Sequence, residues 1–262
     1  MEKIISRENP KIKLLSKLLK SKKARNEKNL FVAEGLRLVR DLLNSKVEVQ
    51  SVFITQECLK RNENDVKQLL DVAENSFLIT DELSLYISDT QSPQGIYAIC
   101  KKLDKCLKLA KIYNNGVFVC LCSLQDPGNV GTIIRTAEAF GVDAVLVTDD
   151  CPDIYSPKVL RSTMGSAFRI PVVSFKNALE MLNALKENEY TTYAAVLEEN
   201  SICLGDFSFQ NKSAVLIGNE ANGLSKEVVK KCDRSLYIPM KGNAESLNAA
   251  TAANIIMWEM SK

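Results

Sequence analysis

The sequence predicts an α/β protein in two parts, a smaller N-terminal α/β domain and a larger C-terminal domain built on a mostly parallel sheet. From Val117 onward, short apolar runs alternate with helical patterns, which is typical of helices that connect parallel strands. Three of these runs lead directly into turns of Gly, Asn and Pro. Before them, a polar, lysine-rich stretch over 101–116 follows about a hundred residues that have strand and helix patterns of their own.

The N-terminal domain is expected to alternate helices and strands. In chain order we expect a helix over 10–20, a helix over 34–43, a strand over 47–54, a helix over 65–73, a strand over 77–79, a helix after Thr80 and a strand over 95–100. In the first helix, Ile12, Leu15 and Leu18 fall on one face. Thr80 is the expected N-cap, because the acidic residues after it suit the positive end of a helix.

The C-terminal domain is expected to have strands over 117–122, 144–148, 191–197, 214–218 and 236–238, and helices over 130–140, 157–163, 177–187, 226–231 and 247–260. That order implies a mostly parallel sheet with helices on both faces. We place the domains at 1–105 and 117–262, with a linker at 106–116.

The turns that follow three of the apolar runs predict a ligand site. They lie in the segments 126–137, 216–225 and 238–248. Because ligands of α/β proteins bind at the carboxyl ends of strands, these turns present backbone N–H groups and short polar side chains where a ligand binds. No Gly-x-Gly-x-x-Gly follows any strand, which argues against a nucleotide-dependent oxidoreductase.

The charge of the chain is unevenly distributed. The net charge is +2, but residues 1–30 hold ten Lys and Arg against three Asp and Glu, so this arm carries +7 and the rest carries −5. Such an arm suits a polyanion, because Lys and Arg neutralise phosphates. The candidate phosphate contacts are Lys11, Lys13, Lys17 and Lys20. The alternative is a basic helix that faces only water.

The cysteine and histidine content excludes several kinds of site. Eight cysteines are scattered without a Cys-x-x-Cys pair, and the chain has no histidine. We therefore expect free thiols in a reducing compartment, with no zinc site, and no histidine base or triad. No apolar run reaches about 18 residues and the N-terminus lacks a signal-peptide core, so we expect a cytoplasmic protein without a membrane span.

Together, in this order and spacing, the three segments resemble the SpoU/TrmH family of the SPOUT class, knotted methyltransferases that act on the ribose 2′-hydroxyl of RNA. Arg161-Ser162-Thr163-Met164-Gly165 is similar to the family's Arg-x-Ser-Met-Gly region. The stretch 26–43 resembles the start of the family's substrate-binding domain, which is similar to a small ribosomal RNA-binding protein fold. The resemblance implies a deep trefoil knot, a homodimer through the knotted domain, S-adenosylmethionine as cofactor and no metal.

By this resemblance, the catalytic residues are Asn129, Arg135, Glu220, Ser246 and Asn248. Arg135 matches the family's proposed catalytic arginine, and Glu220 is expected to orient Arg135 or the substrate. A guanidinium has a pKa above about 12 and is a poor base, so gripping a phosphate and stabilising the developing alkoxide is the safer role. Asn129 is expected to act from the loop before its helix. The alternative is an N-cap Asn and a surface Arg in an ion pair.

The resemblance also implies a cofactor site formed by Gly218, Asn219, Ile238, Met240, Leu247 and Leu197. Gly218 is expected to let the backbone approach the adenosine closely. As an alternative, 216–225 is merely a strand-to-helix turn with Ser225 as N-cap. The helix over 247–260 also reads as a buried core helix, with Trp258 as a core or dimer contact.

The function implied is S-adenosylmethionine-dependent methylation of a ribose 2′-hydroxyl in RNA, with large-subunit ribosomal RNA favoured. Arg161 is a candidate contact to an RNA phosphate, or else part of an ordinary salt bridge. The alternatives are a tRNA 2′-O-methyltransferase and a non-catalytic RNA-binding protein. The second would have little need for the five catalytic residues together.

Overall fold

The computed structural model describes residues 1–88, 90–103 and 116–262, which form two compact units. The first unit holds 1–103 together with the later segment 154–168, and the second holds 116–153 and 169–262 of the described residues. Apart from Gly116, the expected linker at 106–116 lies outside the described residues, and the domain limits stay a prediction.

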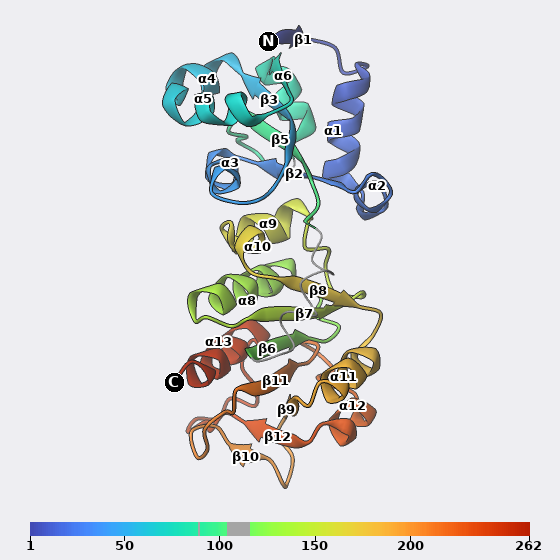
Figure 1. The fold of residues 1–262 in the computed structure, drawn as a ribbon, viewed down its shortest axis with the longest axis vertical. Helices are drawn as coiled ribbons and strands as arrows, with labels where there is room; N and C mark the ends of the chain where they lie inside the picture. The colour runs from blue at the N-terminus through green and yellow to red at the C-terminus, as the bar shows by residue number, and fades with distance from the viewer. Residues whose placement is uncertain (89, 104–115) are drawn as a thin grey trace. The chain divides into compact units, whose positions relative to one another are not determined.

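The first unit is built on a mixed five-stranded sheet (Figure 1). Its strand order is β1 (Glu2–Ile4), β4 (Asn75–Ile79), β3 (Val49–Thr55), β5 (Ile96–Lys101), β2 (Leu30–Glu34). The first three are mutually parallel, and β5 runs antiparallel to both of its neighbours. The helices are α1 (Pro10–Lys20), α2 (Lys22–Lys28), α3 (Leu36–Leu43), α4 (Gln56–Arg61), α5 (Glu63–Val72), α6 (Asp81–Ile87) and α9 (Pro157–Thr163); α10 (Ser166–Arg169) follows α9.

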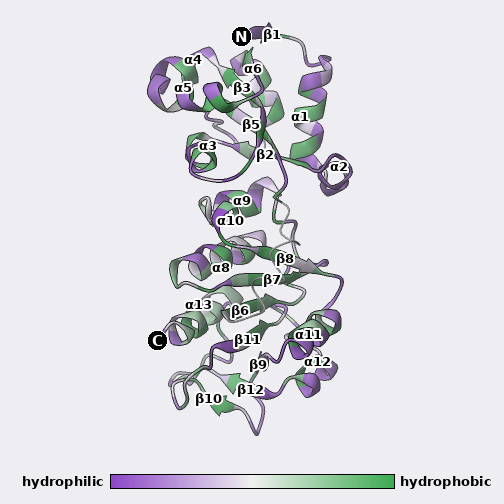
Figure 2. Cartoon of the chain, viewed as in Figure 1, coloured by the Kyte–Doolittle hydropathy of each residue, from purple (hydrophilic) through white to green (hydrophobic). Residues whose placement is uncertain are grey.

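Helix α1 shows why the first unit folds as expected. Ile12, Leu15 and Leu18 are fully buried in the core beneath the sheet, as their spacing predicts. Burying each contributes roughly 1.5–3 kcal/mol relative to leaving it exposed. Figure 2 shows the resulting division of α1 into hydrophobic and hydrophilic stretches. The predicted N-cap of α6 is also confirmed, because Thr80 Oγ1 accepts a hydrogen bond from the backbone N–H of Leu83 at 3.2 Å.

The second unit is a three-layer α/β structure on a seven-stranded sheet. The strand order is β10 (Ile202–Cys203), β12 (Arg234–Tyr237), β9 (Thr191–Ala195), β11 (Lys212–Ile217), β6 (Gly116–Leu121), β7 (Ala144–Thr148), β8 (Val172–Phe175). Every neighbouring pair is parallel, which confirms the predicted fold class. Helices α8 (Pro127–Ala139) and α13 (Ala249–Met260) cover one face, and α11 (Ala178–Glu187) and α12 (Lys226–Lys231) cover the other (Figure 1). The implied knot stays a prediction.

Several short elements were not expected from the sequence. They are β1, β2, α2, α4, α10, β8 and β10. Strands of two to five residues offer too few positions for a periodic pattern. In β2 all five residues are buried, Glu34 among them, so no alternation exists to be read.

Two further predictions concern cysteines and membranes. The seven cysteines that the structure describes are all free thiols, five of them buried. Within the described residues, no helix has the length and apolar character needed to span a membrane.

Candidate active site at the carboxyl ends of the parallel strands

The carboxylate of Glu220 connects the segments that follow two adjacent strands. Strands β11 and β6 lie side by side in parallel, with Ile217 opposite Leu121, so the loops after them leave the same edge of the sheet. From the β11 loop, Glu220 Oε2 accepts a hydrogen bond from the N–H of Gln125 at 2.9 Å, and Oε1 accepts one from the N–H of Asp126 at 3.2 Å. Glu220 thereby fixes the backbone of the two residues that precede α8.

Asn129 lies in the first turn of α8, which corrects the expectation that it acts from a loop. Asp126 is the N-cap, and its Oδ1 accepts from the N–H of Asn129 at 2.9 Å. Pro127 occupies the first helical position, where its missing N–H costs nothing and its fixed φ suits the helix. The helix therefore begins three residues earlier than 130, and Asn129 is not an N-cap.

Both ends of the Asn129 amide are engaged. Its Nδ2 donates to Glu220 Oε1 at 2.9 Å, and its Oδ1 accepts from Asn248 Nδ2 at 3.0 Å. Asn248 is the N-cap of α13, where its Oδ1 accepts from the N–H groups of Ala250 and Thr251. Glu220, Asn129 and Asn248, which the sequence singled out separately, thus form one hydrogen-bonded chain that joins the β11 loop to the starts of α8 and α13. We call it the Asn129 network.

The Asn129 network keeps Glu220 ionised. Burial raises the pKa of the Glu220 carboxyl, but the hydrogen bonds from Asn129 and from the backbone N–H groups of Gln125 and Asp126 outweigh it. The net pKa lies below its ordinary value, because these donors favour the charged form. At neutral pH the carboxylate is an acceptor only, which fixes the Asn129 amide with its nitrogen toward Glu220.

Arg135 is exposed on α8, two turns beyond the helix start. Within the described residues its guanidinium makes no ion pair or hydrogen bond, so the alternative of a surface ion pair finds no support. The hydrogen bonds of Glu220 go to Asn129 and to backbone, which differs from the expectation that Glu220 orients Arg135. An exposed cationic group that has no partner among the described residues is available to an anionic substrate.

Gly218 and Asn219 shape the loop that carries Glu220. Asn219 Nδ2 donates to the carbonyl of Ser123 at 2.7 Å, and its backbone pairs with Gly223 as an isolated bridge. A Cβ on Gly218 would lie 2.3 Å from the Gly223 carbonyl carbon and 2.5 Å from Leu224 N. The loop's own backbone therefore requires glycine here. Ser225 caps α12 as the sequence indicated, its Oγ accepting from the N–H of Val228.

A cavity of about 440 Å³ opens at the carboxyl ends of β9 and β12, two strands of the same parallel sheet. Of the predicted cofactor residues, Leu197, Ile238, Met240 and Leu247 line it, and so does Ser246. Gly218 and Asn219 are not among the lining residues. The cavity and the Asn129 network are joined by the chain itself. The lining residues Ser246 and Leu247 directly precede Asn248, which belongs to the network.

Part of the cavity lining was missed from the sequence. It consists of Ala195, Val196, Leu236, Tyr237, Gly242, Ala244, Glu245, Ala252 and Ile256. Ala195 and Tyr237 are the last residues of β9 and β12, so strand-end position was the signal that could have found them. Leu197, Met240 and Leu247 are large apolar side chains left exposed at the cavity. A mostly apolar cavity with strand-end backbone at its edge suits a small ligand that has an apolar part and polar groups for hydrogen bonds.

The lysines of the basic arm differ in how they are engaged. Lys11 forms an ion pair with Glu2 at 2.7 Å and lies over the Phe77 ring, and Lys13 pairs with Glu8 at 2.5 Å. Lys17 and Lys20 form no ion pair with any described residue. Two of the four lysines predicted to contact phosphate, Lys11 and Lys13, therefore already have an acidic partner, whereas Lys17 and Lys20 do not pair with a described acidic residue.

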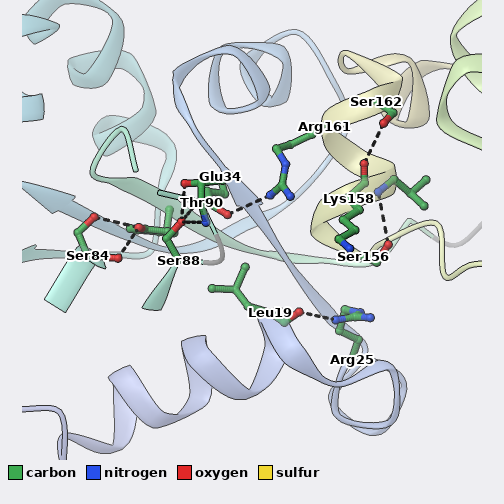
Figure 3. Close-up of polar contacts among 12 residues, drawn as sticks. Leu19, Arg25, Glu34, Ser84, Ser88, Thr90, Ser156, Lys158, Arg161 and Ser162 are labelled. Atoms are coloured by element: carbon green, nitrogen blue, oxygen red, sulfur yellow. Dashed lines mark hydrogen bonds and ion pairs between the residues drawn. The ribbon is translucent and has the colours of Figure 1, made fainter. Parts of the chain in front are cut away.

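In this structure Arg161 forms a salt bridge, which was the alternative to a contact with an RNA phosphate. Its Nη1 lies 3.4 Å from Glu34 Oε2, and Figure 3 shows the pair together with Ser88, which donates its hydroxyl to the other oxygen of Glu34. Glu34 is only 8% exposed, so these donors satisfy a carboxylate that burial would otherwise destabilise. A contact of Arg161 to RNA stays a prediction.

Comparison with known families and proteins identifies the chain. The SpoU rRNA Methylase family matches residues 116–258, and the MRM3-like substrate binding domain matches residues 9–98. The chain belongs to the SpoU rRNA methylase family. It is 34% identical to the 23S rRNA (guanosine(2553)-2′-O)-methyltransferase RlmP of Bacillus subtilis over 99% of both chains.

Solved structures of SpoU methylases have the same fold over nearly the whole chain. The AdoMet-bound rRNA methyltransferase from Sinorhizobium meliloti matches with a TM-score of 0.85 at 26% identity, over 99% of this chain and 97% of that one. The SpoU methyltransferase AviRb from Streptomyces viridochromogenes, in complex with AdoMet, also gives 0.85 at 26% identity, over 97% of each chain. The cavity and the Asn129 network are therefore the candidate active site of a SpoU methylase.

Proposed function

We propose that this protein transfers the methyl group of S-adenosylmethionine to a ribose 2′-hydroxyl of large-subunit ribosomal RNA. The observation that carries the proposal is the apolar cavity at the ends of β9 and β12, from which Ser246 and Leu247 lead into the Asn129 network. One edge of the sheet thus offers a cofactor-sized cavity and, beside it, a fixed set of polar groups.

The cavity residues fit S-adenosylmethionine. When bound, the cofactor supplies an electrophilic methyl group on a sulfonium centre. Leu197, Ile238 and Leu247 offer apolar surface for its adenine, and the carboxylate of Glu245 at the cavity is a favourable neighbour for its positive charges. Gly218 and Asn219 act in this account by shaping the loop next to the cavity; their direct contact with the cofactor is part of the same proposal.

The remaining residues act on the RNA. Arg135 holds a phosphate of the target nucleotide and stabilises the alkoxide that forms as the 2′-hydroxyl loses its proton. Asn129, oriented from both ends, presents a fixed amide to the ribose, and Ser246 offers a hydroxyl at the cavity. Each group acts by positioning or by electrostatics, which is what an in-line displacement requires.

Ribosomal RNA is favoured over tRNA by the names of the curated relatives and by the share of the chain that RlmP covers. RlmP, named for a 23S rRNA guanosine, aligns over 99% of the chain. A Streptomyces viridochromogenes relative named for a 23S rRNA uridine is 39% identical over 51% of it. A solved structure titled for C/U34 methylation on tRNA covers only 55% of this chain, with a TM-score of 0.51. The relatives differ in target nucleotide but share large-subunit RNA.

The protein acts as a homodimer in the cytoplasm, in this proposal. Helix α13 leaves Ile255 and Trp258 exposed, at 37% and 54%, although its other face packs on α8. An exposed apolar helix face in the second unit favours contact with a second copy. We expect sedimentation to show that the wild type is a dimer and that Trp258→Glu is a monomer. A Trp258→Glu protein that stays dimeric would exclude this face of α13 as the dimer interface.

Two measurements on the wild-type protein and on Arg135→Ala test the proposal. They are calorimetry of S-adenosylmethionine binding and an assay of methyl transfer to ribosomal RNA. The wild-type protein should bind the cofactor, and Arg135→Ala should bind it within a few-fold while losing methyl transfer to ribosomal RNA. Glu138→Gln, on the same helix, serves as a folding control that should keep its activity. Absence of cofactor binding in the wild type would reject the enzyme, and normal transfer by Arg135→Ala would reject the role of Arg135.

A further inference from the structure

A cationic hollow lies on the first unit, whereas the candidate active site belongs to the second. It has a volume of about 320 Å³ and is lined by four cationic residues, Arg7, Lys13, Lys17 and Lys20, together with Ser16, Ser21 and Tyr86. Three of the cations lie on α1 at spacings of four and three residues, which places them on one helical face. Tyr86 comes from α6, which packs against α1 (Figure 1).

The ring of Tyr86 is held among cations and remains accessible. The guanidinium carbon of Arg7 lies 4.6 Å from the ring centroid, and Lys20 Nζ lies 5.8 Å from it. The Tyr86 side chain is nevertheless 44% exposed, and its neighbour Leu85 is 58% exposed. The ring therefore contributes little buried area to the core of the first unit, and its position is not explained by packing.

The charge of the hollow is largely uncompensated. Lys13 pairs with Glu8, but Arg7, Lys17 and Lys20 form no ion pair with the described residues. Lys17 and Lys20 in the last turn of α1 favour the negative end of that helix, which accounts for their presence in part. It does not account for Arg7 or for the exposed ring. Like charges that converge on one hollow repel each other unless an anion binds there.

We propose that this hollow binds one unpaired nucleotide of the RNA substrate, its phosphate among Arg7, Lys17 and Lys20 and its base stacked on Tyr86. The inference rests on the proposed function and names the form of RNA recognised. Cations that hold a phosphate beside an aromatic ring that stacks a base are the means by which proteins bind single-stranded RNA. A duplex offers the phosphates but no free base face, so the ring favours a loop or a bulge.

Binding measurements on single-stranded and duplex RNA of equal length test the stacking. Tyr86→Leu should weaken binding to the single strand about 5- to 150-fold, the loss expected for one stacked base, and leave duplex binding nearly unchanged. Tyr86→Phe should bind like the wild type, because stacking needs the ring and not the hydroxyl. Leu85→Ala is the matched control for an exposed apolar side chain and should change neither affinity.

Salt dependence tests the phosphate contacts. Lys17→Gln with Lys20→Gln should reduce the log–log salt slope for single-stranded RNA by about 1.4, since each contact contributes about 0.7. Lys23→Gln is the control, because Lys23 is 84% exposed and pairs with Glu27. Inorganic phosphate alone should compete only weakly.

Unchanged affinity of Tyr86→Leu for the single strand would overturn the proposal, and so would equal losses on both RNAs. Binding of inorganic phosphate as tight as that of RNA would show a simple anion site instead. Circular dichroism and the melting curve report folding of the first unit in every variant, and S-adenosylmethionine affinity should be unchanged. The readout is RNA binding, so failure of this inference is distinguishable from failure of methyl transfer by the wild-type protein.

Discussion

Asn129 has no freedom to rotate its amide, because its two ends meet groups of opposite character. Glu220 accepts from the nitrogen, and the Asn248 nitrogen donates to the oxygen. The amide orientation therefore follows from the ionised state of Glu220 and from the cap of α13. A side chain held in this way at the start of α8 loses little entropy when a substrate binds it.

Replacing Glu220 with Gln should produce a stability difference that depends on pH. The folded pKa of Glu220 lies below its ordinary value of 4.5, so ionisation stabilises the native state above that pH. This contribution is lost as the pH falls through the lower folded pKa. Wild-type and Glu220→Gln proteins should therefore differ in melting temperature at pH 7 and converge towards pH 3. Parallel melting curves at all pH values would contradict the assignment.

Gly218→Ala should destabilise the folded protein through contacts within its own loop, independently of any cofactor contact. The added Cβ would meet backbone of Gly223 and Leu224 at 2.3–2.7 Å, and backbone cannot move aside as a flexible side chain does. We expect a loss of about 1–3 kcal/mol of unfolding free energy. Gly242→Ala is the control, because no atom lies within 4 Å of its added Cβ. Equal stability of the two variants in denaturant titrations would reject the close packing at Gly218.

At the scale of elements, the helix ends organise the candidate site. Asp126 caps α8, Asn248 caps α13 and Ser225 caps α12, all at the carboxyl edge of the parallel sheet. A cap satisfies the free N–H groups of the first turn and fixes where the helix starts. In α13 the cap residue also donates to Asn129, so one side chain serves both helix stability and the site.

Two variants of Asn248 separate these roles. Asn248→Ala removes the cap and the hydrogen bond to Asn129, so it should cost about 1 kcal/mol of stability and most of the activity. Asn248→Asp keeps an acceptor for the N–H groups of Ala250 and Thr251 but has no donor for Asn129. It should therefore melt like the wild type and methylate slowly. A fast Asn248→Asp enzyme would show that the Asn129 network does not position the substrate.

The sequence predicted the elements that carry a long or strongly apolar pattern. The buried face of α1 and the parallel strands from β6 to β12 follow from periodicity and from alternation of strand and helix. The start of α8 was misplaced because Pro127 and Gly128 read as a turn, although proline suits the first helical position. The five buried residues of β2 include Glu34, and only its partners Ser88 and Arg161, far away in sequence, make that burial tolerable.

Side-chain partners were the part of the candidate site that the sequence could not supply. The residues of the Asn129 network were predicted, but its hydrogen bonds join positions more than ninety apart in sequence. The engagement of Lys11 by Glu2 likewise depends on where β1 lies, and β1 is too short to be predicted. The pattern identified residue types for each role, and the fold decided which of them meet.

At the scale of the whole molecule, the proposed function gives the two units separate roles. The first unit carries the basic arm, with ten cationic side chains in its first thirty residues, and the second carries the cavity and the Asn129 network. Affinity for RNA and chemistry on the ribose are therefore separable. Variants in the cationic hollow should change RNA binding and its salt dependence, whereas variants in the Asn129 network should change methyl transfer.

Mapping of 2′-O-methyl nucleotides can show whether the protein methylates a ribose 2′-hydroxyl of large-subunit ribosomal RNA. Ribosomal RNA from cells that lack the gene, incubated with the purified protein and S-adenosylmethionine, should gain one 2′-O-methyl nucleotide that is present in wild-type RNA. Arg135→Ala protein should not restore it. Methylation on a base, or a 2′-O-methyl group restored only in tRNA, would contradict the account.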